Sequence, residues 1–183
     1  MRENSRVRVE GEPPIIRHRE DADLEACASI ARAIRACDGY PSFLPDDDYA
    51  AFVSPANALG AWVAVLGHDI VGHVAVRTSS APSATELVTA ALGIEPAAFA
   101  FVSRLMVLPR ARRRGIARCL LGVAAAEIRG LGLTPVLDVL ADGEAAIALY
   151  EREGWRRLGE TRFRSRSGTE FDEVVFLAPE MDD

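Results

Sequence analysis

The sequence contains no lysine, since each of its 21 basic residues is an arginine. A mechanism that forms a Schiff base on lysine is therefore excluded. Cysteine is also scarce, and Cys27, Cys37 and Cys119 include no CxxC pair. An odd count without that spacing indicates neither a disulfide framework nor a zinc site. The three histidines show no ligand spacing either, so we predict no metal site.

Long apolar runs are missing as well. No stretch approaches the roughly 20 residues that a membrane-spanning helix needs. The charged first residues have no apolar segment of the kind that a secretory signal requires. We therefore expect residues 1–13 to be a flexible tail, the protein to be cytoplasmic, and no membrane to be its partner. The net charge of −6 argues against a nucleic-acid partner, because such binders are usually basic.

The remaining chain is sufficient for one domain with one core. Hydrophobic residues make up 49% of the 183 residues, and a chain of this size builds a single core. We therefore predict one domain over residues 14–183. Its hydrophobic periodicity predicts strands at 15–19, 61–66, 70–78, 101–108, 135–140, 155–163 and 173–177. Helices are predicted at 23–38, 47–53, 83–93, 115–130 and 144–153.

Two local expectations concern these helices. Residues 83–86 (SATE) fit a capping box, in which Ser83 caps a short helix and Glu86 reaches back to it. That helix interrupts a long connection between two strands, and long connections often form lids over functional sites. Cys119 lies in the 115–130 helix, where we expect it to belong to the core.

The segment with the most chemical information runs from Val107 to Ala117. It joins an apolar strand to a helix through an arginine-rich loop, and Gly115 and Ala117 lie at the start of that helix. A helix N-terminus presents unpaired N–H groups and about half a positive charge. Small residues there allow a ligand to approach the backbone. The pattern predicts a phosphate or pyrophosphate site, although it is neither a Walker A loop nor a GxGxxG motif.

Two blocks of this sequence resemble one known family. Residues 112–117 (RRRGIA) resemble the R/Q-x-x-G-x-G/A motif of the GCN5-related N-acetyltransferase (GNAT) superfamily. Residues 145–155 (AAIALYEREGW) resemble the family's A-x-x-L-Y-x-x-x-G-F/W signature. The blocks occur in the right order and at the right separation, and the resemblance extends from Ile15 to about Leu177.

The resemblance implies an α/β fold with a mixed, mostly antiparallel sheet of about six to seven strands, flanked by helices. The fourth and fifth strands would splay apart, and the co-substrate acetyl-coenzyme A (acetyl-CoA) would lie between them without a metal. Backbone groups of the fourth strand would pair with its pantetheine arm, and those of the loop and helix start would hold its pyrophosphate. The implied cofactor-binding residues are Leu105, Met106, Val107, Arg112, Arg113, Arg114, Gly115, Ile116, Ala117 and Gly143.

The resemblance also implies a catalytic acid. Tyr150 matches the family position whose hydroxyl lies near the thioester sulfur, and a phenol is a suitable proton donor to a departing thiolate. The alternative is a half-buried tyrosine that packs on Trp155. Gly143 stands where the family usually has a small polar residue, often Asn. A side-chain contact to the cofactor is therefore lost.

The catalytic base is less clear from the sequence. Many family members have a Glu on the fourth strand, but the nearest residues here, Ser103 and Arg104, are unsuited. Asp138 matches a carboxylate position that some members use as the base, and its alternative is a structurally paired strand residue. His73 is a weaker candidate, and a chain of water molecules is another.

These observations predict an acetyl-CoA-dependent N-acetyltransferase that moves an acetyl group to a primary amine of a small molecule by direct attack. The alternatives are a protein or peptide N-terminal acetyltransferase and a non-catalytic CoA-binding module. The acidic run Asp46–Asp48 would attract a cationic amine, or it would simply cap a helix. The sequence leaves a homodimer open.

Overall fold

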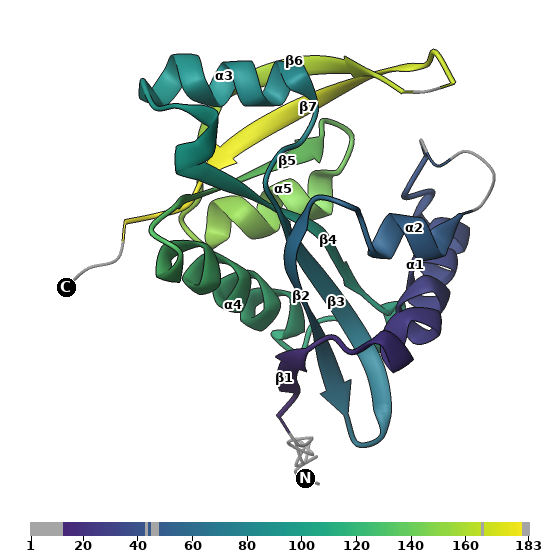
Figure 1. Ribbon diagram of the computed structural model, residues 1–183. Helices are drawn as coiled ribbons and strands as arrows, with labels where there is room; N and C mark the ends of the chain where they lie inside the picture. Colours follow the sequence, from purple (N-terminus) through teal and green to yellow (C-terminus); the bar gives the residue numbers. More distant parts are fainter. Residues whose placement is uncertain (1–12, 43, 45–47, 166, 181–183) are drawn as a thin grey trace, which may run out of the picture.

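A computed structural model describes residues 13–42, 44, 48–165 and 167–180 of the chain. Seven strands form one sheet in the order β1-β2-β3-β4-β5-β7-β6 (Figure 1). The strands are β1 (Ile15–His18), β2 (Ala58–Leu66), β3 (Asp69–Arg77), β4 (Phe99–Val107), β5 (Thr134–Leu140), β6 (Arg156–Arg164) and β7 (Glu170–Leu177). The helices are α1 (Leu24–Asp38), α2 (Tyr49–Val53), α3 (Pro82–Leu92), α4 (Ile116–Gly130) and α5 (Glu144–Arg152).

The sheet is mixed, and its middle is irregular. β4 and β5 run parallel, whereas the other neighbouring strands run antiparallel. The parallel pairing joins Phe99–Val102 to Thr134–Leu137 and then stops. Beyond it, β4 stays paired with β3, and β5 stays paired with β7. The two central strands therefore separate at their C-terminal ends, as predicted for the fourth and fifth strands.

The helices cover both faces of the sheet (Figure 1). Apolar residues of α4 and α5 pack with those of β2–β5 and β7 into the largest core cluster, which includes Leu120 and Phe176. α1 and α2 pack against Val63 and Met106 in a second cluster. α3 forms a third cluster with β4, β5 and β7 and lies beside β6. The separated ends of β4 and β5 thus lie between the helices that pack on the sheet.

Two local predictions were wrong. α3 begins after Ala81, and neither a capping box nor a side-chain cap is found there among the described residues. Pro82 occupies the first helical turn. Its fixed φ angle suits the start of a helix, and it has no backbone N–H that would need a capping side chain. Cys119 is exposed, because its neighbours Leu120 and Leu121 take the buried face of α4.

Part of the acidic run lies outside the described residues, namely Asp46 and Asp47, as does most of the predicted flexible tail. Asp48 caps α2, since its Oδ1 accepts a hydrogen bond from the Ala51 N–H at 3.0 Å. No helix within the described ranges is both long and apolar enough to cross a membrane.

Candidate active site

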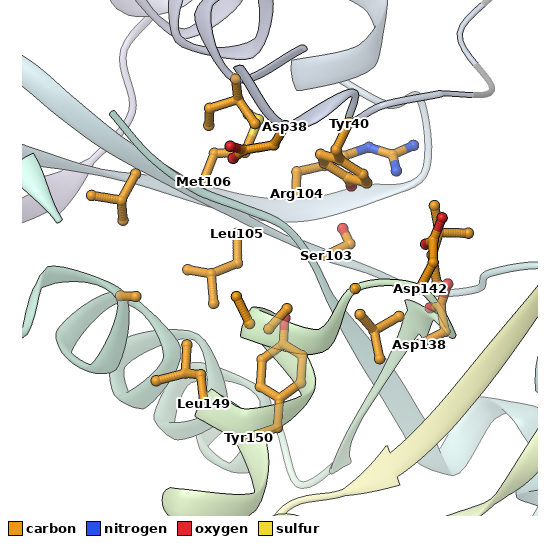
Figure 2. Close-up of a pocket in the computed structure, with 18 of the residues that line it drawn as sticks. Asp38, Tyr40, Ser103, Arg104, Leu105, Met106, Asp138, Asp142, Leu149 and Tyr150 are labelled. Atoms are coloured by element: carbon orange, nitrogen blue, oxygen red, sulfur yellow. The ribbon is translucent and has the colours of Figure 1, made fainter. Parts of the chain in front are cut away.

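A cleft of about 810 Å³ opens where β4 and β5 separate (Figure 2). Its walls are the C-terminal halves of both strands, the N-terminal part of α5 and the end of α1. Tyr150 reaches into it from α5, and Asp38 and Tyr40 lie on the side of α1 (Figure 2). The cleft brings together Leu105, Met106, Val107, Arg112, Ala117, Asp138, Gly143 and Tyr150.

A bulge shapes the β4 wall of the cleft. His73 and Ala75 of β3 pair with Met106 and Ser103, so two residues of β4 oppose one of β3. Arg104, in the bulge, has a left-handed φ of 54°. Its carbonyl lies 3.1 Å from the ring Nδ1 of His73. The bulge therefore redirects the backbone of β4 beside the cleft.

His73 supports this bulge from outside the cleft lining. Its side chain is fully buried, and burial lowers the pKa of the imidazole to about 4. The neutral ring donates from Nδ1 to the Arg104 carbonyl, because a carbonyl can only accept. His73 is not among the residues that line the cleft. The weaker candidate base is therefore buried away from the cleft.

The free edge of β4 faces the cleft. The Leu108 N–H donates to the Val71 carbonyl of β3 at 2.9 Å. Because neighbouring residues of a strand point their backbone groups to opposite edges, the N–H and carbonyl of Val107 face the cleft. The Val107 carbonyl accepts a hydrogen bond from Arg112 Nε at 3.2 Å. Its N–H points into the space between the two strands.

The start of α4 forms one end of the cleft. Gly115, the N-cap residue, has a φ of 77°, and no side chain among the described residues caps the helix. Arg113 also has a left-handed φ, of 62°. Arg112 forms an ion pair with Asp38 at the end of α1, whereas Arg113 and Arg114 are exposed. The unpaired N–H groups of the first turn and two exposed guanidinium groups suit a phosphate-bearing ligand.

Gly143 is small for a steric reason. A Cβ at this position would lie 3.0 Å from the Leu140 carbonyl oxygen and 3.3 Å from Cγ2 of Val139. The end of β5 therefore approaches the start of α5 so closely that a side chain would force one of them to move. This contact gives a physical reason for the departure from the family pattern.

Tyr150 lies on α5 with its ring in the core and its hydroxyl directed into the cleft (Figure 2). The ring is 7% exposed and lies near Trp155 and Phe176, with centroids 6.2 and 5.8 Å away. Burial raises the pKa of the phenol above its usual value, so the hydroxyl keeps its proton at neutral pH. The packed ring agrees with the interpretation of Tyr150 as a core residue, and its role as the catalytic acid stays a prediction.

Asp138 belongs to a buried charged cluster that the sequence did not reveal. Its Oδ1 lies 3.8 Å from Arg77 Nη2, and its charge acts on the neighbouring Glu173 carboxyl of β7. Burial, followed by the charge of Asp138, raises the pKa of the Glu173 carboxyl to about 8.

The sequence analysis missed Arg77 and Glu173. Arg77 ends an apolar run on β3, and Glu173 begins one on β7. The signal available in the sequence for these two residues was a charge at the edge of an apolar run. Their meeting with Asp138 depends on the β3-β4-β5-β7 order of the sheet, which the sequence alone does not give.

A strand edge open to a cleft and a helix N-terminus at its end suit a long ligand that terminates in phosphates. The fold and site thus define the class of acyl-CoA-dependent transferases. The sequence profile of the acetyltransferase (GNAT) family matches residues 28–155, and the chain belongs to this family. This match confirms the resemblance and the fold that it implied.

Solved structures show the same fold. The ribosomal-protein-S18-alanine N-acetyltransferase from Escherichia coli is 21% identical, with a TM-score of 0.63 over 93% of this chain and 96% of that one. Arabidopsis thaliana NAA60 in complex with acetyl-CoA is 22% identical, with a TM-score of 0.65 over 90% and 97%. A putative phosphinothricin N-acetyltransferase is 17% identical, with a TM-score of 0.65 over 92% and 99%. None of the curated proteins compared with the chain matches it.

Proposed function

We propose that this protein is an acetyl-CoA-dependent N-acetyltransferase that acetylates the primary amine of a small molecule. The observation that carries the proposal is the cleft between β4 and β5, which joins a phosphate-suited helix start to a buried acid–base cluster. Acetyl-CoA supplies the thioester to be attacked, and a structure of the related NAA60 was solved with it.

The binding residues divide into two groups by the chemistry they offer. The N–H groups of Gly115, Ile116 and Ala117, together with Arg113 and Arg114, suit the pyrophosphate. The free edge of β4 at Leu105 and Val107 suits amides, which pair with a strand edge as another strand would. The backbone groups of Met106 point to β3, opposite to those of Val107, and its side chain packs in the cluster with α1 and α2. Arg112 holds the loop against α1 through Asp38.

Catalysis requires the acceptor ammonium to lose a proton before its nitrogen can attack. Asp138, with Glu173 beside it, is the base that accepts this proton. The neutral amine forms a bond to the thioester carbonyl carbon, and the Val107 N–H stabilises the oxyanion that develops. The carbon–sulfur bond then breaks, and Tyr150 gives its proton to the departing thiolate. The new amide nitrogen loses its extra proton to solvent, from which Tyr150 regains one.

The test is thiol release from acetyl-CoA with a panel of amino acids, polyamines, aminoglycosides and peptides. We expect at least one small amine to raise the rate above background hydrolysis, with mass spectrometry confirming the acetylated product. Exclusive turnover of peptides would favour the N-terminal acetyltransferase alternative. Binding of acetyl-CoA without release of thiol by any amine would contradict catalysis and favour a CoA-binding module.

A further inference from the structure

A second hollow, of about 560 Å³, adjoins the cleft between β3, the start of α3 and the β6–β7 hairpin. Four side chains line both the cleft and the hollow: Arg77, Arg104, Asp138 and Glu173. The acid–base cluster therefore lies at the junction of the two spaces. A ligand in the hollow reaches this cluster from the side opposite to the start of α4, where the phosphates of acetyl-CoA are expected.

Buried polar atoms without hydrogen-bond partners concentrate around this hollow. Within the described part of the chain, they include Arg77 Nε, Ser83 Oγ, Asp138 Oδ1 and Glu173 Oε2. All four residues line the hollow, and Glu173 is 95% buried, since its exposed fraction is 5%. Burying such atoms without partners costs free energy. Donors and acceptors occur together, so a ligand that satisfies them carries both kinds of group.

The positive groups gather at one side of the hollow. α3 begins there, and its N-cap residue, Ala81, has no capping side chain in the described structure. Pro82 has no N–H and the Thr85 N–H donates to the Ala81 carbonyl, so the N–H groups of Ser83 and Ala84 add partial positive charge to that of Arg77. Ser80 accepts a hydrogen bond from Arg77 Nη2 at 3.0 Å and so orients the guanidinium. This side suits an anion, while the carboxyl groups of Asp138 and Glu173 suit an ammonium group.

The charge balance also favours an acceptor with its own negative charge. Arg162 and Arg164 line the hollow but pair with Asp172 and Glu170, at 2.6 and 2.7 Å. Arg77 lies 3.8 Å from Asp138 Oδ1, and burial with the charge of Asp138 raises the pKa of the adjacent Glu173 carboxyl, which favours its neutral form. An ammonium group alone would leave these three residues with a net positive charge in a buried site, which is unfavourable. A polyamine would add still more positive charge.

We propose that this hollow binds the acceptor and selects a primary amine that also carries an anionic group, as a free amino acid does. The anionic group lies against Arg77, Ser83 and the start of α3, and the ammonium group lies against Asp138 and Glu173. The inference rests on the proposed acetyltransferase function. The proposed preference distinguishes a free amino acid from a protein N-terminus as the acceptor. A protein N-terminus has the same α-amine but an amide in place of the carboxylate.

The test compares free amino acids with their carboxamides in the thiol-release assay. Each pair has the same side chain and differs in the negative charge. For the acids that are acetylated, we expect kcat/KM to exceed that of the amide at least about tenfold, the factor that corresponds to 1.4 kcal/mol. Equal or faster acetylation of the amides, or turnover of peptides or polyamines alone, would overturn the inference and leave acetyl transfer itself established.

Two hydroxyl variants of α3 provide a matched comparison. Ser83 and Thr89 both have a buried hydroxyl oxygen without a described hydrogen-bond partner, but only Ser83 lines the hollow. Ser83→Ala should lower the acid-to-amide ratio of kcat/KM by about tenfold or more, as expected for one lost hydrogen bond to a charged group. Thr89→Ala should leave that ratio unchanged. An equal effect of the two variants, or no effect of Ser83→Ala, would contradict the assigned anion site.

A binding measurement separates this inference from the proposed function. The protein is titrated with amino acids in a calorimeter in the presence of CoA. Because CoA has no acetyl group to transfer, the complex cannot react. We expect acids to bind in this titration and their carboxamides to bind at least about tenfold more weakly. Equal binding of both, or binding of neither, would overturn the inference, whether or not acetyl transfer occurs. Arg77→Gln should abolish the preference, with the acetyl-CoA thermal shift as the check that the variant is folded.

Discussion

Tyr150 is the residue in which packing and chemistry overlap. Its ring is held between Trp155 and Phe176, and its hydroxyl lies at the cleft. Because burial raises the pKa of the phenol, the side chain keeps its proton at neutral pH. A tyrosine with these properties is suited to donate a proton and unsuited to accept one.

Tyr150→Phe tests this role with minimal change to the packing. We expect kcat to fall about 100-fold, because the departing thiolate loses its proton donor, while acetyl-CoA affinity changes little. Steady-state kinetics and a titration with acetyl-CoA measure the two quantities. Trp155→Phe is the packing control and should lower stability more than kcat. Full activity of Tyr150→Phe would reduce the residue to a packing role.

Glu173 makes stability depend on pH. Its pKa is raised to about 8 in the folded protein, so between its ordinary value and about 8 the folded state holds a proton that the unfolded state has released. Stability from this group is therefore present at low pH and is lost as the pH rises through about 8. Glu173→Gln keeps a neutral group at every pH. It should match the parent near pH 5 and exceed it at pH 8 or above, on the order of 1–2 kcal/mol.

Chemical denaturation at several pH values checks this prediction. Asp172→Asn on the same strand is the control, since Asp172 is exposed and pairs with Arg162 at the surface. Such a pair contributes little to stability, so this variant should keep the pH dependence of the parent. Identical pH profiles for the parent and Glu173→Gln would show that Glu173 titrates normally.

At the scale of elements, the site depends on two irregularities of the backbone. The bulge in β4 is held by His73 through the Arg104 carbonyl, and it turns the strand edge toward the cleft. The start of α4 follows two left-handed residues, Arg113 and Gly115, and has no side-chain cap among the described residues. Regular strands and capped helices would have satisfied these backbone groups within the protein, leaving none for a ligand.

Gly115 allows the phosphate site to be tested at the start of α4. Gly115→Glu places a negative charge at the N-terminus of the helix, so we expect the acetyl-CoA thermal shift to disappear. Gly115→Ala is the matched control, because both variants pay the cost of a side chain at a φ of 77°. An added Cβ meets no atom within 4 Å. The alanine variant should therefore melt earlier but keep the shift, and a shift retained in the glutamate variant would contradict the site.

At the scale of the whole molecule, the sheet divides the proposed substrates between two spaces. The cleft lies between the start of α4, the N-terminal part of α5 and the end of α1, and the hollow lies beside α3 and the β6–β7 hairpin. They meet at the charged cluster of Arg77, Asp138 and Glu173, where the parallel pairing of β4 with β5 has ended. In the reaction that we propose, the thioester and the amine approach this cluster from different sides.

Acetyl-CoA should stabilise the whole fold, because the cleft that binds it exists only when the sheet and helices are assembled. At a ligand concentration of about 100 times Kd, we expect the melting temperature to rise by roughly 5–10 °C. Differential scanning fluorimetry measures the shift, and desulfo-CoA or free phosphate distinguishes the contribution of the thioester from that of the pyrophosphate end. No shift at saturating acetyl-CoA would contradict co-substrate binding.

The sequence by itself determined the element order, the start of α4 and the two family blocks, because these depend on residues that are close in the chain. Periodic apolar residues predict a helix or strand from its own segment. Gly115 and the arginines before it predict an anion site from a single turn. Most element boundaries agree with the structure to within a few residues, and the seven strands match the implied range.

Only the tertiary structure decided how charged and polar groups meet. Arg77, Asp138 and Glu173 come from three strands far apart in the sequence, and their burial raises the pKa of Glu173. His73, a candidate base by residue type, became a buried support for the bulge. Ser83, expected to cap a helix, lines a hollow instead. Desolvation and charge interactions depend on neighbours in space, and neighbours brought together by long-range strand pairing leave no local pattern in the sequence.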